Sequence, residues 1–326
     1  MRGGQIEMES QSESYPPPFR APLVIADSDK YDDTNVEAGE LIPRFDFQKL
    51  NSESDTFSEI CKNWGLFHLS NHEIPSDLLA AIDEHARAIF SLPFETKQEI
   101  LVNPLTYFWG TPALTPSGAP IERRSQVVDW VEGINLPCSH LSQLNSSHVL
   151  INPLRILLQE YEAHLVRIAT TILETMQSAI RSDHRGVLSG ILRIYRYPKC
   201  EVDKWGIDEH TDSSILTILN QDDVGGLEVY KEGKWYSVPP IRGSLVVNLG
   251  DMAQAISDDR FVSAKHRVRV SKYSDRLSIG YFGFPPRDYV IKSSVYRPFT
   301  YGDFQCQVQR DINTLGTKIG LDRFRL

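Results

Sequence analysis

The sequence has few cysteines, and none of them stands at a spacing typical of a metal or redox motif. The four are far apart and form no Cys-x-x-Cys pair: Cys61, Cys138, Cys200 and Cys306. This pattern argues against a zinc knuckle and against the disulfide framework of small secreted domains. We therefore expect a reducing, cytoplasmic setting.

Long hydrophobic runs and an excess of positive charge are missing too. Residues 1–33 are polar apart from residues 23–26, so they lack the hydrophobic stretch of a secretory signal. No later run reaches the length of a membrane span. The chain carries 34 basic against 43 acidic residues, a formal charge of −9, which disfavours contact with phosphate backbones or anionic membranes. We expect neither nucleic acid nor a membrane as a partner.

The first half of the chain is predicted to be mainly helical. Residues 1–40 show no apolar period and are interpreted as a flexible tail, whereas residues 41–185 form a helical N-terminal region. Ser76 is the predicted N-cap of a helix that stops before Pro93. A second helix opens at Asn152-Pro153. Its apolar face combines Leu154, Leu158, Tyr161, Leu165, Ile168, Ile172 and Met176.

The second half changes to short β-rich segments. Turn sequences separate predicted strands at residues 191–197, 214–220, 226–230, 234–238, 244–249, 266–271 and 277–284. Short strands without intervening helices predict a double-stranded β-helix, or jelly roll, over residues 186–290. Residues 291–326 are a predicted helical extension whose helix ends at Gly316. The fold class is therefore mainly β with α, a jelly roll flanked by N-terminal and C-terminal helices.

His210, Asp212 and His266 form a candidate metal site. The two-residue period of extended chain places His210 and Asp212 on one face, next to the predicted strand 214–220. That pair alone would be interpreted as a surface turn. However, His266 opens a later strand, which in a jelly roll can lie across the barrel from the pair. Two histidines and one carboxylate make the facial triad of non-haem Fe(II) oxygenases, which leaves positions open for a cosubstrate and O2.

Arg276 and Ser278 are candidates for holding the cosubstrate. A 2-oxo acid that chelates iron leaves its far carboxylate buried, where it needs a fixed cation. The two residues are two apart on one predicted strand, so both point inward if either does. Alone, an arginine on a strand is most often a solvent-facing charge. Its place ten residues after His266, with apolar Leu277 and Ile279 alternating, favours the inward orientation.

These residues make the chain resemble the plant 2-oxoglutarate-dependent dioxygenases from Ile42 onward. Similar segments are residues 42–47, 63–68, 71–72, 210–212, 216–219, 221–222, 226–229, 247–251, 266–268 and 276–278. The resemblance implies Fe(II) at the triad, 2-oxoglutarate on Arg276 and Ser278, O2 as the oxidant and ascorbate as a supporting reductant. The expected reaction oxidises a small molecule and releases succinate and CO2. We expect the protein to be a monomer.

One family motif departs from the usual pattern. Where relatives read Asn-x-Tyr-Pro-Pro-Cys, this chain has Tyr195 in the asparagine position and keeps Tyr197, which the family places near the distal carboxylate of the cosubstrate. Both tyrosines are therefore candidate cosubstrate residues, and the replacement is expected to reshape the pocket. Tyr195 has an equally good interpretation as a core aromatic on a strand.

Two short segments, residues 107–112 and 316–324, resemble the gibberellin 2-oxidases that act on twenty-carbon gibberellins. A gibberellin is an apolar polycyclic acid, so its pocket should combine aromatic walls with one cation. The candidate wall residues are Tyr107, Phe108, Trp109, Phe282 and Phe284. The candidate cations are Arg123, Arg124 and Arg196. Each of these residues also has an ordinary interpretation as a core aromatic or a solvated charge.

Three other functions stay open at this point. The first is an oxygenase of another plant acid or phenolic, such as a flavonoid, an alkaloid or an auxin-like acid. The second is a non-catalytic barrel that binds a hormone or a metal, because a scaffold does not dictate activity. The third is a zinc hydrolase, which would use the triad but leave Arg276 and Ser278 unexplained.

Overall fold

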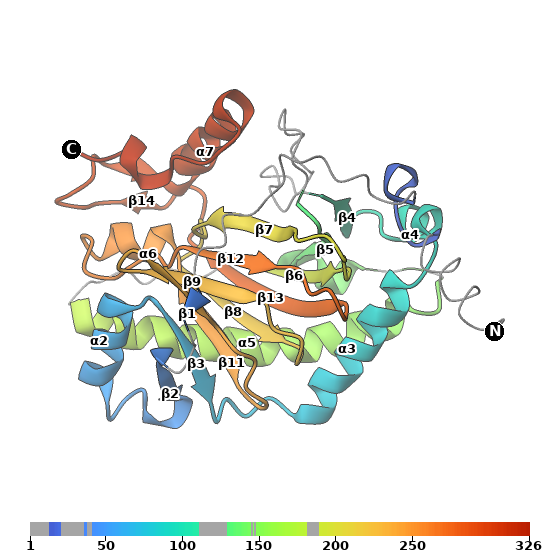
Figure 1. Cartoon of the computed structure of the whole chain (residues 1–326). Coiled ribbons are helices and arrows are strands. Elements are labelled where there is room, and N and C mark those ends of the chain that lie inside the picture. The colour runs from blue at the N-terminus through green and yellow to red at the C-terminus, as the bar shows by residue number, and fades with distance from the viewer. Residues whose placement is uncertain are drawn as a thin grey trace.

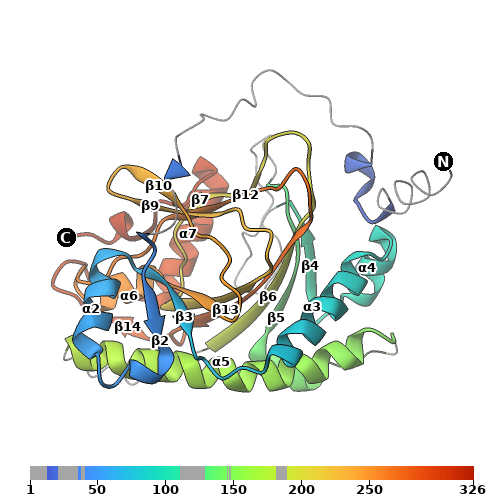
Figure 2. The same ribbon diagram turned by 60° about the horizontal axis from the view of Figure 1, so that its bottom comes forward.

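The computed structural model describes residues 13–20, 36–37, 41–110, 129–144, 146, 148–180 and 189–326. Two β-sheets lie one above the other, and helices cover the outer face of the larger sheet (Figures 1 and 2). The predicted fold class, a jelly roll flanked by helices, is confirmed.

The larger sheet has eight strands and forms the floor of the barrel. Their spatial order is β2 (Arg44–Asp46), β3 (Leu66–Ser70), β11 (Leu245–Leu249), β8 (Leu216–Gln221), β13 (Arg276–Phe284), β6 (Ser189–Tyr197), β5 (Glu132–Pro137) and β4 (Thr106–Trp109). Only the β2–β3 pair is parallel among these described strands. Every residue of the central strand β13 is buried, because the strand is covered on both faces.

The smaller sheet has five strands and carries the histidines. Its order is β1 (Val36–Glu37), β10 (Lys234–Ser237), β9 (Leu227–Lys231), β12 (His266–Arg269) and β7 (Trp205–His210). Glu232 and Gly233, both at positive φ, join β9 to β10 as the two-residue turn that twisted hairpins favour. A further pair, β14 (Val290–Ile291) and β15 (Phe299–Thr300), lies near the C-terminus.

One long helix supports the larger sheet from outside. It is α5 (Ile151–Ile180), and all seven apolar residues of its predicted face are buried. Figure 2 shows α5 running beneath the larger sheet. The other helices are α2 (Ser54–Asn63), α3 (Ser76–Phe90), α4 (Phe94–Ile100), α6 (Asp251–Ile256) and α7 (Tyr301–Leu315), with short 3-10 turns at Pro17–Phe19, Phe47–Lys49, Cys138–Gln143 and Gly320–Arg323. None of the described helices is long and apolar enough to cross a bilayer.

Several local predictions need correction. Pro75, not Ser76, occupies the N-cap of α3, so Ser76 is its first helical residue. Helices dominate residues 41–185, but this region also contributes β2, β3, β4 and β5 to the larger sheet. Two described pieces of the expected tail contact the rest of the fold: in residues 13–20 the rings of Tyr15 and Phe19 contact Trp109, and β1 pairs with β10. The predicted end of α7 is confirmed, because Gly316 caps it at a φ of 78°.

Candidate active site

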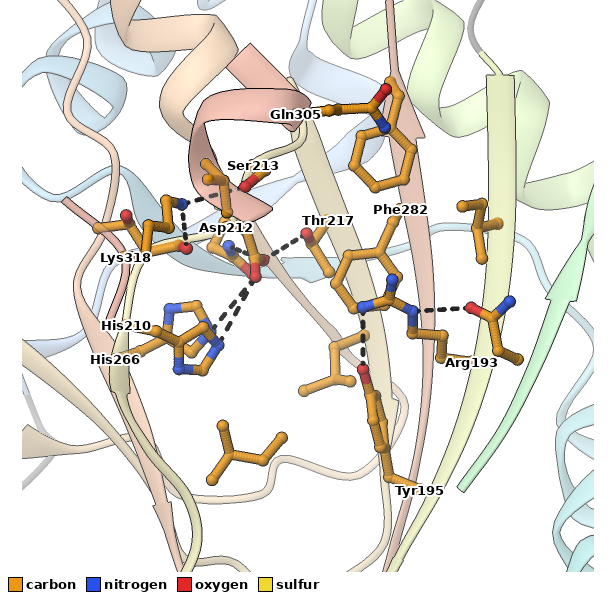
Figure 3. Close-up of a pocket in the computed structure, with 18 of the residues that line it drawn as sticks. Arg193, Tyr195, His210, Asp212, Ser213, Thr217, His266, Phe282, Gln305 and Lys318 are labelled. Atoms are coloured by element: carbon orange, nitrogen blue, oxygen red, sulfur yellow. Dashed lines mark hydrogen bonds and ion pairs between the residues drawn. The ribbon is translucent and has the colours of Figure 1, made fainter. Parts of the chain in front are cut away.

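The three candidate metal ligands meet at one end of the barrel. His210 is the last residue of β7 and His266 the first of β12, and the two pair directly in register. Their ring centroids are 4.3 Å apart. Asp212 lies in the loop from β7 to β8, and one ligand atom from each residue falls within 4.8 Å of the others (Figure 3). His266 therefore lies beside His210 in the same sheet, not across the barrel as the sequence suggested.

The two oxygens of the Asp212 carboxylate have different partners. Oδ2 accepts from the Thr217 hydroxyl at 2.6 Å and from the Asn248 amide at 2.8 Å. Oδ1 instead faces the Nε2 atoms of His210 and His266, at 3.7 and 3.9 Å. The carboxylate thus keeps one oxygen for a metal. Sequence reasoning missed Thr217 and Asn248, although Asn248 is the lone polar residue of β11 and pairs directly with Thr217 of β8.

The histidine rings are oriented by backbone carbonyls. Nδ1 of His210 lies 2.8 Å from the Asp208 carbonyl, and Nδ1 of His266 lies 2.9 Å from that of Ala264. Because a carbonyl only accepts, each Nδ1 carries a proton, and in the neutral tautomer this leaves the lone pair on Nε2. Burial, assisted by His266, lowers the pKa of His210 to about 3. At neutral pH this imidazole is in the state that binds a metal.

The pKa of Asp212 is lowered to about 2. Burial alone would raise it, but the two neighbouring histidines and the hydrogen bonds from Thr217 and Asn248 outweigh that effect. The carboxylate is therefore ionised at neutral pH. Two imidazole nitrogens and one carboxylate oxygen form a donor set that suits Fe(II).

The candidate cosubstrate residues lie on the facing sheet. Arg276 pairs with Tyr197 and Ser278 with Tyr195, between β13 and β6. The guanidinium of Arg276 donates to the Ser278 hydroxyl at 3.1 Å and to the Gln221 carbonyl oxygen at 2.9 Å. It also stacks on the Tyr197 ring, 4.9 Å from the centroid. One cavity is lined by the candidate metal ligands together with Arg276, Ser278, Tyr195 and Tyr197.

Arg276 has the properties expected of a carboxylate-binding residue. Its side chain is 1% exposed, and its Nε has no hydrogen-bond partner. Within the described part of the chain it contacts only neutral acceptors. A buried cation without an anion is unfavourable unless a ligand supplies the negative charge. The far carboxylate of a bound 2-oxoglutarate fits this requirement.

The cavity has a volume of about 1020 Å³, large enough for a cosubstrate and a polycyclic substrate together. Phe282 and Phe284 line it, as expected. Tyr107, Phe108 and Trp109 are not among its described lining residues, because β4 is the far edge of the larger sheet. Tyr107 donates to Glu132 at 2.6 Å, the Phe108 ring packs on Tyr195, and that of Trp109 packs on Trp130.

One cation that lines the cavity, Arg193, is a residue that the sequence analysis did not select. Arg196 points to the opposite face of β6, where it pairs with Glu132 at 2.8 Å and with Asp275 at 2.7 Å. Arg123 and Arg124 lie outside the described residues. Arg193, three residues before Arg196, lines the cavity beside Phe282 (Figure 3).

Comparisons with known proteins agree with this site. Residues 188–285 match the 2OG-Fe(II) oxygenase superfamily, and residues 42–153 match the family described as non-haem dioxygenase in morphine synthesis N-terminal. The chain belongs to the 2OG-Fe(II) oxygenase superfamily. It is therefore an oxidoreductase, a 2-oxoglutarate-dependent dioxygenase that uses Fe(II).

Several relatives of this oxygenase have names that refer to gibberellins. Gibberellin 2-beta-dioxygenase 6 of Oryza sativa subsp. japonica is 34% identical over 280 residues, covering 80% of this chain and 76% of the relative. Gibberellin 2-beta-dioxygenase 8 of Arabidopsis thaliana is 32% identical over 306 residues, covering 89% and 88%.

Solved oxygenase structures share the fold. The rice dioxygenase for auxin oxidation superposes with a TM-score of 0.72 at 24% identity, over 87% of this chain and 100% of that one. JOX2, in complex with 2OG, Fe and JA, gives a TM-score of 0.70 at 25% identity, over 93% of both chains. The first similarity supports the architecture alone.

Proposed function

We propose that this oxygenase oxidises a gibberellin, with His210, Asp212 and His266 as the Fe(II) ligands. In this proposal Arg276 and Ser278 bind the far carboxylate of the cosubstrate 2-oxoglutarate, with Tyr197 and Tyr195 beside them. The bound Fe(II) and 2-oxoglutarate supply the oxidising chemistry, in which O2 is consumed, succinate and CO2 are released and the substrate is oxidised. A monomeric state and a cytoplasmic location stay predictions.

The observation that carries the substrate proposal is Arg193 beside an aromatic wall. Its guanidinium donates to the Asn135 carbonyl oxygen at 3.0 Å and to the Tyr195 hydroxyl at 3.4 Å, and lies 4.7 Å from the centroid of the Phe282 ring. All of these partners are neutral, and among the described residues no carboxylate pairs with Arg193. A half-buried cation next to Phe282 and Phe284 suits an apolar molecule with one acid group.

In this proposal the surrounding residues orient Asp212, exclude water and anchor the substrate. Thr217 and Asn248 fix one oxygen of Asp212, so the other stays directed at the metal position. Phe282 and Phe284 exclude water from the wall of the cavity. Arg193 anchors the acid and thereby orients the carbon skeleton toward the metal. The gibberellin names of the relatives support this assignment.

The experiment is an incubation of the protein with Fe(II), ascorbate, 2-oxoglutarate and a pool of twenty-carbon and nineteen-carbon gibberellins. Mass spectrometry of the products and measurement of succinate should reveal a gibberellin that gains one oxygen, with matching succinate. Succinate without any altered gibberellin would contradict the substrate proposal and keep the oxygenase assignment. A failure to consume 2-oxoglutarate with any substrate would point to a non-catalytic barrel.

A variant tests the anchor directly. Arg193→Met removes about 2 kcal/mol of charge-assisted hydrogen bonding and should raise the KM for the gibberellin about 30-fold. The KM for the cosubstrate should not change, and the methyl ester should be turned over equally by parent and variant. Arg155→Met is the matched control, because Arg155 also donates to an amide oxygen, at 2.9 Å, but on α5. A variant that distinguishes acid from ester as well as the parent does would eliminate Arg193 as the anchor.

A second candidate function is oxidation of another apolar plant acid. Arg193 and the two phenylalanines recognise an acid group and an apolar body, not a particular ring system. JOX2, crystallised with JA, shares this fold at 25% identity. Turnover of such an acid while gibberellins are inert, with the same dependence on Arg193, would favour this function.

A further inference from the structure

A lysine from the C-terminal segment reaches the loop that carries the candidate metal ligands. Helix α7 ends at Gly316, and two residues later the Lys318 side chain, 15% exposed, extends toward that loop. Its ammonium donates to the Thr211 carbonyl at 2.8 Å and to the Ser213 hydroxyl at 3.1 Å (Figure 3). It also forms an ion pair with Asp251, at 2.6 Å. The segment that lines one side of the cavity thus holds the metal-binding loop.

The same loop is held from its other side by the start of α6. The Asp251 amide donates to the Asp212 carbonyl at 2.8 Å, and the Met252 amide donates to that of Ser214 at 3.1 Å. The Asp251 carboxylate accepts from the Ser263 hydroxyl at 2.8 Å and pairs with Lys318. Asp251 therefore connects the metal-binding loop to the C-terminal segment through its backbone and its side chain.

This arrangement places Lys318 between two candidate ligands. Thr211 is the single residue that separates His210 from Asp212, and the structure assigns no regular secondary structure to Thr211 or Asp212. Such a loop lacks the repeated backbone bonds that fix a strand, so each side-chain donor contributes more to its conformation. The Thr211 carbonyl to which Lys318 donates belongs to the peptide unit that joins Thr211 to Asp212.

We propose that Lys318 is a positioning residue for the metal. Its hydrogen bonds hold residues 211–213 in the conformation that presents His210 and Asp212 to the ion. The proposal rests on the metal ligands assigned under Proposed function. Removing an outer partner of a metal site typically weakens metal binding about 10- to 100-fold, and this is the effect expected here.

Charge and position predict opposite results when Lys318 is replaced, which makes the test decisive. Lys318→Met removes a positive charge and leaves Asp251 unpaired, so the site becomes more negative and simple electrostatics predicts tighter binding of a cation. Loss of positioning predicts weaker binding. A weaker affinity for the metal can therefore not be a charge effect.

The experiment measures the binding of Mn(II) alone, without 2-oxoglutarate, by the loss of the electron paramagnetic resonance signal of the free ion. Lys318→Met should raise the Kd about 10- to 100-fold, whereas Lys318→Arg, which keeps the charge and the donors, should recover most of the affinity. Lys62→Met is the control, because it breaks a surface ion pair on α2, at 2.7 Å. His266→Ala should abolish binding.

The possible outcomes separate a failure of the metal-site assignment from a failure of the positioning role of Lys318. Retained binding in His266→Ala would overturn the metal site itself. Loss of binding in His266→Ala together with parental or tighter binding in Lys318→Met would overturn the positioning role alone. A lower thermal midpoint in Lys318→Met with an unchanged Kd would mark Lys318 as merely structural and also refute the proposal. If Lys318→Met does not fold by circular dichroism, Lys318→Gln replaces it under the same criteria.

Discussion

Replacing Arg276 by methionine should separate cosubstrate binding from the stability of the fold. Arg276 is 1% exposed, and in the described structure its guanidinium contacts the neutral acceptors Ser278 and Gln221. The folded protein without cosubstrate therefore contains a buried cation that lacks an anion. Such a charge is held at an energetic cost, and an apolar side chain of similar length is neutral or stabilising in its place.

The loss in the free energy of 2-oxoglutarate binding follows from the guanidinium donors that Arg276→Met removes. A carboxylate at Arg276 would gain at least one charge-assisted hydrogen bond in a buried site, and losing this interaction costs about 3 kcal/mol. That loss corresponds to roughly a 100-fold higher Kd for 2-oxoglutarate. The KM for the prime substrate should change little.

Thermal unfolding provides the assay. At a 2-oxoglutarate concentration of about 100 times the parental Kd, binding stabilises the parent by about 2.7 kcal/mol, whereas a 100-fold weaker site gains only about 0.4 kcal/mol. For 326 residues, an unfolding entropy of about 2.1 cal/mol/K per residue converts these values to Tm shifts of about 4 °C and less than 1 °C. Without 2-oxoglutarate, Arg276→Met should be as stable as the parent or more stable.

A single pattern would refute this reasoning. If Arg276→Met destabilises the ligand-free protein, while the KM for the cosubstrate and the Tm shift that it produces both stay unchanged, Arg276 is a structural residue and another cation binds the cosubstrate. Arg155→Met, at a partly exposed position on α5, controls for the general effect of removing an arginine.

Three further perturbations test the support of the site and of the core. Gly250→Ala should weaken Mn(II) binding in a titration, since a Cβ there would lie 2.8 Å from the Asp212 carbonyl oxygen and displace the metal-binding loop. In urea unfolding, the free energy of unfolding of His68→Phe should fall less at acid pH than that of the parent. The reason is that burial, together with the nearby charge of Arg44, lowers the pKa of His68 to about 4. Its neutral form is favoured in the fold, and on the order of 3 kcal/mol is lost as the pH falls from about 6.5 to 4. Lys97→Met should cost about 3 kcal/mol in the same assay at neutral pH, because it removes a fully buried partner, 2.6 Å away, from Glu132.

Structural features that follow a regular spacing of residues along the chain were predicted correctly from the sequence. The apolar stripe of α5 and the alternation along β13 each predicted a buried face, and both faces are buried. The same alternation brought Arg276 and Ser278 to one side of their strand. These features depend on residues close in the chain, so local spacing is sufficient to predict them.

Features that depend on strand order could not be found in this way. Tyr107, Phe108 and Trp109 form an aromatic run as promising as Phe282 and Phe284. Only the order of the strands places β4 at the edge, with β5 and β6 between it and β13. Local sequence contains no information on which strands become neighbours, so the two runs could not be ranked.

The two-residue period of strand β6 is sufficient to predict that Arg193 lines the cavity. Tyr195 and Tyr197 were both expected near the cosubstrate, and a strand that turns these residues inward also turns Arg193 inward and Arg196 outward. The structure follows this rule: Arg193 lines the cavity, and Arg196 pairs with Glu132 on the opposite face. The same two-residue period excludes Arg196 as the cation of the cavity.

The orientation of His210 depends on an irregularity in β7 that no periodic pattern predicts. Between β7 and β12, His266 pairs with His210 but Val268 pairs with Ile207, so over this stretch β7 contains one residue more than its partner, and a second shift follows where Arg269 pairs with Trp205. Such an extra residue is a β-bulge, and it reverses the parity of the strand beyond it. Ile207 lines the cavity, and in a regular strand Glu209 would follow it on that face while His210 would point away. The bulge returns His210 to the cavity, beside His266, an orientation that the alternation of a regular strand does not predict.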